Sequence, residues 1–130
     1  MINFLIAVLC VASVCAENDS LYQEWLDAMY QVNSAQIEVD QIVDKLHTAQ
    51  VTYWAVQSAV ITHLQGHAEC NENCEMLVSL LQDLKMWGHT IVDIQNLYSV
   101  ALYVRDSAVA TEQTRWWAIV THFNWCPKCK

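Results

Sequence analysis

Apolar residues recur along the chain at alternating spacings of four and three, the pattern of helices that bury one side. The longest row begins at Leu21, and only its last two positions, His63 and His67, are polar. Its apolar positions are Leu21, Trp25, Ala28, Val32, Ala35, Val39, Ile42, Leu46, Ala49, Tyr53, Val56 and Val60. A register shifted by one residue fails, because it includes Asn33 and Asp40. The average spacing of 3.5 residues is typical of a coiled coil or an antiparallel bundle.

Gly66 and residues 67–73 are expected to end this first segment. The apolar stripe after them comprises Leu77, Leu80, Leu84, Trp87, Ile91, Ile94, Tyr98 and Leu102. Asp106 or Ser107 is able to cap a last helix, for which no Gly or Pro marks the start. The apolar positions of that last helix are Val109, Trp116, Val120 and Phe123.

The pattern therefore predicts an all-α fold, an antiparallel helical bundle of three to four helices with a long coiled-coil-like first segment. Few residues interrupt it, since Gly66, Gly88 and Pro127 are the only glycines and prolines. A β-rich domain of this size would need many more turn residues. Whether the first segment is one helix or two is left open, with breaks weighed near residues 33–34 and 47–48.

The first 16 residues have the pattern of a secretory signal peptide. Residues 4–14 form an uncharged apolar run, too short to cross a bilayer, and small residues precede a cleavage site after Ala16. A signal anchor is the alternative. We expect a secreted, extracellular protein in which residues 17–130 form a single helical domain with no membrane span after cleavage.

The charge of the chain argues against two classes of partner. It contains 14 acidic residues against 6 lysines and arginines, which gives a formal net charge of −8. Nucleic acids and anionic membrane surfaces attract basic proteins. We therefore expect no nucleic-acid partner.

Four cysteines remain after the expected cleavage: Cys70, Cys74, Cys126 and Cys129. An even number of cysteines in a secreted chain is typical of disulfides, which would brace the bundle. Three pairings are open. We favour bridges between the 70/74 turn and the 126/129 tail, which a helix break near Asp106 would bring together. Local pairing within each couple is the alternative.

The same cysteines are also candidates for thiol–disulfide redox catalysis and for zinc binding. Residues 125–129, Trp-Cys-Pro-Lys-Cys, locally resemble the thioredoxin-type motif, but no βαβ pattern surrounds them and the chain ends one residue later. His63 and His67 share a helical row with Cys70 and Cys74, a donor set that suits zinc. An oxidising compartment would remove the thiols, so we predict neither a metal site nor a cofactor.

The aromatic residues are the remaining candidates for a binding role. Tryptophans and tyrosines on or beside the apolar stripes either fill the core or line a cavity for an apolar ligand. The ligand-binding candidates are Trp25, Tyr53, Trp54, Trp87, Tyr98 and Trp116. Asn18 begins an N-glycosylation sequon. No His lies at a recognisable catalytic spacing from a nucleophile, so no catalytic residue is predicted.

These observations predict a small secreted helical binding protein and not an enzyme. Its partner is expected to be another protein or a small hydrophobic ligand. A homo-oligomeric structural coiled-coil protein, associating through the long row, is the first alternative. A thiol–disulfide redox protein that uses Cys126 and Cys129 is the second.

Overall fold

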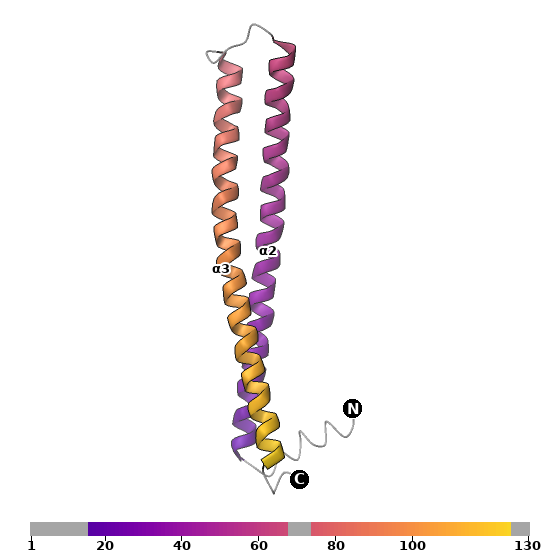
Figure 1. Ribbon diagram of the computed structural model, residues 1–130, viewed down its shortest axis with the longest axis vertical. Helices are drawn as coiled ribbons and strands as arrows, with labels where there is room; N and C mark the ends of the chain where they lie inside the picture. Colours follow the sequence, from indigo (N-terminus) through magenta and orange to yellow (C-terminus); the bar gives the residue numbers. More distant parts are fainter. Residues whose placement is uncertain (1–15, 68–73, 126–130) are drawn as a thin grey trace. The chain divides into compact units, whose positions relative to one another are not determined.

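The computed structural model describes residues 16–67 and 74–125, with side chains from Ser20 onward. Two α-helices of 51 residues each occupy these residues (Figure 1): α2 spans Ala16–Gly66 and α3 spans Glu75–Trp125. The helices pack against each other, and the described residues contain no strand. The prediction of an all-α fold is confirmed.

The described part of the chain forms fewer helices than the sequence pattern predicts. α3 continues through Asp106 and Ser107, so the predicted break there is wrong, and the described residues contain two helices instead of three or four. Hydroxyl groups in this part of α3 are satisfied within the helix: Thr111 Oγ1 donates to the Ser107 carbonyl at 3.0 Å, and Thr114 Oγ1 to that of Ala110 at 2.9 Å. The Asp106 carboxylate, predicted as a cap, instead accepts hydrogen bonds from the Arg105 guanidinium inside the continuous helix.

The first segment is one helix, which settles the point that its sequence left open. Thr48 Oγ1 donates to the Asp44 carbonyl at 3.0 Å, and Thr52 Oγ1 donates to the Thr48 carbonyl at 2.9 Å. The polar residues near position 48 thus make local hydrogen bonds without interrupting α2.

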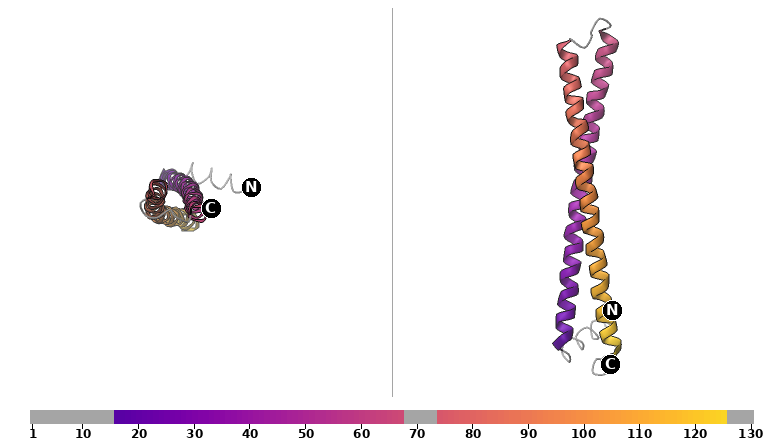
Figure 2. Two further views of the ribbon diagram at one scale, coloured as in Figure 1. Left: turned by 90° about the horizontal axis from the view of Figure 1, so that it is seen from above. Right: turned by 60° about the vertical axis from the view of Figure 1, so that its left-hand side comes forward.

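Contacts divide the chain into two units. Unit 1 comprises Met1–Ile37 with Leu102–Lys130, and unit 2 comprises Glu38–Ala101. In both units a part of α2 lies beside a part of α3 (Figure 2). The two helices are antiparallel in unit 1, because Trp25 contacts Glu112 whereas the later residue Gln36 contacts the earlier residue Arg105.

Unit 2 has the same antiparallel order. Tyr53 lies opposite Gly88, and the later residue His63 lies beside the earlier residue Cys74. A Cβ atom added to Gly88 would lie 3.7 Å from Tyr53 Cε2, an ordinary van der Waals distance. Close packing therefore does not require a glycine in the middle of α3.

The row predicted for the first segment is the buried side of α2. Every one of its positions from Leu21 to His63 is buried or half-buried, and His67 is exposed. The fully buried members are Ala28, Ala35, Val39, Ile42, Ala49 and Val60. The rejected register contains the exposed residues Asn33 and Asp40, so the choice of register is confirmed.

The buried side of α3 includes both stripes predicted for the second half of the chain. Leu77 is buried and the other positions named for those stripes are half-buried. Arg105 and Glu112 are also half-buried: Arg105 lies between the two apolar stripes, and Glu112 lies within the second, between Val109 and Trp116. The two predicted helices are therefore one helix whose buried side contains two charged residues.

Candidate functional site

Unit 1 contains a cluster of aromatic and charged side chains between α2 and α3. The indole Nε1 of Trp25 donates a part-buried hydrogen bond of 2.8 Å to Glu112 Oε1. The Trp25 ring also lies 5.2 Å from Trp116, between ring centroids, and 5.9 Å from Tyr22. Both ring pairs are tilted, a favourable arrangement for aromatic rings.

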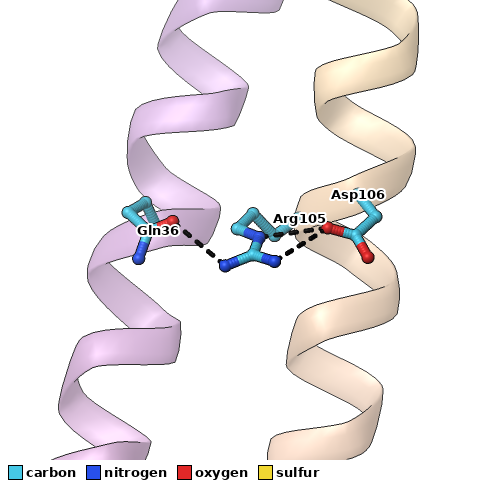
Figure 3. Close-up of polar contacts among 3 residues, drawn as sticks. All are labelled: Gln36, Arg105 and Asp106. Atoms are coloured by element: carbon cyan, nitrogen blue, oxygen red, sulfur yellow. Dashed lines mark hydrogen bonds and ion pairs between the residues drawn. The ribbon is translucent and has the colours of Figure 1, made fainter.

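Arg105 joins the two helices of unit 1 at a second point. Its guanidinium points across to α2, where Nη1 donates to Gln36 Oε1 at 3.5 Å (Figure 3). Its Nε and Nη2 both donate to Asp106 Oδ1, at 3.1 and 2.9 Å. Because Arg105 has partners on both helices, its charge is tolerated on the buried side of α3.

An exposed ion pair is the third polar link in unit 1. Arg115 Nη1 lies 2.9 Å from Glu24 Oε2, and both side chains are more than 40% exposed. Exposed pairs of this kind contribute about 0–1 kcal/mol to stability. This pair therefore has less influence on the pairing of the helices than the part-buried bond between Trp25 and Glu112.

Unit 2 contains an open depression of about 370 Å³. Its lining residues are Asp44, Lys45, Thr48, Ala49, Trp87 and Ile94. Of the predicted ligand-binding residues, only Trp87 lines it. Most of this lining is apolar, but the depression is open and not enclosed, so it would bury little of a small ligand's surface.

At the end of α2, His63 Nε2 lies 3.2 Å from Cys74 Sγ, and the rings of His63 and His67 lie 4.6 Å apart. Within the described residues, no group of three or more His, Cys, Asp or Glu side chains is arranged to hold a metal ion. Cys70, Cys126 and Cys129 lie outside the described residues, as does the side chain of Asn18. The disulfide and glycosylation assignments stay predictions.

The predicted aromatic candidates do not gather at one place. Trp25 and Trp116 are in contact in unit 1, whereas the other four belong to unit 2. Tyr53, Trp87 and Tyr98 are half-buried on the sides of the helices that face each other. Trp54 points outward and is 59% exposed.

Sequence reasoning missed the polar residues of unit 1 that lie between the helices. Arg105 and Glu112 continue the four-and-three spacing of the α3 row, which runs Tyr98, Arg105, Glu112 at steps of seven. That spacing is the signal in the sequence, but a search for apolar residues passes over it, because charged residues are seldom buried.

A larger feature is the apolar surface on the outer sides of both helices. Eighteen large apolar residues of the described chain are exposed, against eight apolar residues that are buried, four of them alanines. In unit 1 the most exposed are Tyr30, Tyr103, Trp117 and Trp125, each at least 64% exposed. Exposed apolar residues that neighbour one another on a helix mark sites of interaction with other molecules.

The chain matches no protein-family model, no curated protein and no solved structure. Within the described residues, neither helix contains a stretch long and apolar enough to cross a membrane.

Proposed function

We propose that this chain is a secreted helical binding protein and that its partner is another protein. One observation carries the proposal: among the described residues of the two paired helices, exposed large apolar side chains outnumber buried apolar ones. Burial of a Trp, Leu or Ile side chain contributes about 1.5–3 kcal/mol. A partner that covers several of these residues would thus bind with substantial free energy.

A protein partner is supported over a small apolar ligand by the distribution of this surface. Exposed residues such as Tyr30 on α2 and Trp117 on α3 project from helices, whereas small ligands are bound in concave sites. Helices recognise other helices or grooves through apolar residues at spacings of three, four and seven. The exposed residues Tyr30 and Ile37 have such a spacing, as do Leu97 and Val104.

Secretion is part of the proposal and rests on the apolar run at residues 4–14 and the small residues before Glu17. The net charge of −8 keeps the secreted chain away from nucleic acids and anionic membranes. A large apolar surface then remains as the main basis for recognition.

The proposal is tested on the protein isolated without denaturant from the medium of cells that produce it. Light scattering after size-exclusion chromatography should give a mass above that of one chain. Trp54→Gln should lower that mass or the fraction assembled. Gln57→Ala, at an exposed polar position of the same part of α2, is the matched control and should change neither.

Two outcomes contradict the proposal. A mass of one chain that carries a small apolar molecule in native mass spectrometry would favour the carrier function. A bare single chain in both measurements would leave the exposed apolar residues without a binding role.

A further inference from the structure

The outer side of α2 in unit 2 carries a second row of residues at spacings of four and three. All of its members are exposed, and the large ones are Val51, Trp54 and Ile61, at 47%, 59% and 50% exposure. The outer row comprises His47, Val51, Trp54, Ser58, Ile61 and Gln65. This spacing is that of a helix-pairing surface, although α3 already covers another side of α2.

The outer row lies in a part of the chain that contains no formal charge. No Asp, Glu, Lys or Arg occurs between Lys45 and the end of α2 at Gly66, although the whole chain contains 14 acidic residues. Two copies of an acidic protein repel each other through most of their surfaces. At the outer row, two copies are able to approach each other without bringing like charges of α2 together.

We propose that a second copy of this chain covers the outer row, in an antiparallel pair of α2 helices related by a two-fold axis beside residue 56. In this register Val51 of one copy lies opposite Ile61 of the other, and Trp54 lies opposite Ser58. His47 lies opposite Gln65. The proposal deepens the proposed function, on which it rests, by naming the partner.

Each of these pairs is chemically matched. Two branched apolar residues meet, the large Trp54 ring meets the smallest side chain of the row, and two hydrogen-bonding side chains meet. The two-fold axis repeats every pair, because in such an interface residue i contacts j and residue j contacts i. An unrelated partner would need a complementary row of its own, whereas the chain supplies this one itself. The pair joins four helices, two from each copy.

The test uses sedimentation equilibrium of the purified secreted protein over a range of concentrations. The wild type should be a dimer at high concentration. Val51→Lys and Ile61→Glu should each weaken the association about tenfold or more, equivalent to about 1.4 kcal/mol. The double variant Val51→Lys/Ile61→Glu should recover most of this loss, because the introduced ammonium and the introduced carboxylate then lie opposite each other in both halves of the dimer.

Two control variants test whether the loss and recovery of association require this register or follow from added charge at any exposed position. Val51→Lys/Leu64→Glu has the same charges, but Leu64 is an exposed residue outside the row, so no recovery is expected. Met29→Lys changes an exposed residue of unit 1 and should leave the dimer unchanged. Circular dichroism should show the same helix content in all variants, since every changed residue is exposed.

A double variant that fails to recover, or a dimer that depends on Met29 and not on Val51, overturns the proposed register. A wild type that stays a single chain at every concentration overturns the second copy as partner. If the native isolate then contains a different protein, the proposed function still stands. If the isolate is also a single chain, both proposals fail.

Discussion

Trp25 and Glu112 are joined by a part-buried hydrogen bond of 2.8 Å between α2 and α3, although 87 positions separate them in the sequence. The carboxylate occupies a position of the α3 row where an apolar residue would be expected, and the indole N–H is its partner. A polar pair on the buried side of two helices favours one register over others, at some cost in stability.

The contributions of Trp25 and Glu112 to the free energy of unfolding should be coupled. Glu112→Leu leaves the Trp25 N–H without its acceptor and should destabilise unit 1 by about 1–3 kcal/mol. Trp25→Phe/Glu112→Leu removes both polar groups and should recover much of that loss. Urea unfolding of the two single variants and the double variant measures the coupling. Strictly additive effects would show that the bond contributes nothing to the pairing of the helices.

Gly88→Ala should stabilise the protein by about 0.5–1 kcal/mol, because alanine is the better helix former and restricts the unfolded chain. The added methyl group would meet Tyr53 at an ordinary contact distance of 3.7 Å. Gly66→Ala, at the last residue of α2, is the control and should have a smaller effect. A lower melting temperature for Gly88→Ala would mean that α3 and Tyr53 approach more closely than this distance.

We predict that the cysteines pair locally, Cys70 with Cys74 and Cys126 with Cys129. The pairing favoured from the sequence depended on a helix break near Asp106, and α3 is continuous there. Peptide mapping without reductant should release separate fragments that contain residues 70–74 and 126–129, with no free thiol. Fragments that stay linked until reductant is added would restore the original pairing.

The secreted protein should begin at Glu17. Small residues at positions 14 and 16 are those that signal peptidase prefers. An intact mass spectrum measures this directly, and treatment with a glycosidase shows whether Asn18 carries a glycan. A mass that includes residues 1–16 would favour the signal anchor and contradict secretion.

The sequence by itself determined the helical fold and the buried side of α2. Twelve apolar residues at spacings of four and three leave one register that is apolar throughout, and every one of them is buried or half-buried. The same spacing identified the apolar members of the α3 row. Periodicity is reliable here because the side of a helix on which a residue lies follows from its position in the chain alone.

The number of helices and the burial of charged residues depend on contacts between the helices, which the apolar spacing does not specify. Arg105 and Glu112 interrupted the pattern in the sequence, so two helices were expected where there is one. Their polar groups are accepted on the buried side because Gln36 and Trp25 satisfy them from the other helix, and no local signal reveals such a partner. The outward position of Trp54 was likewise decided by packing, because α2 has apolar residues on two sides and α3 covers only one of them.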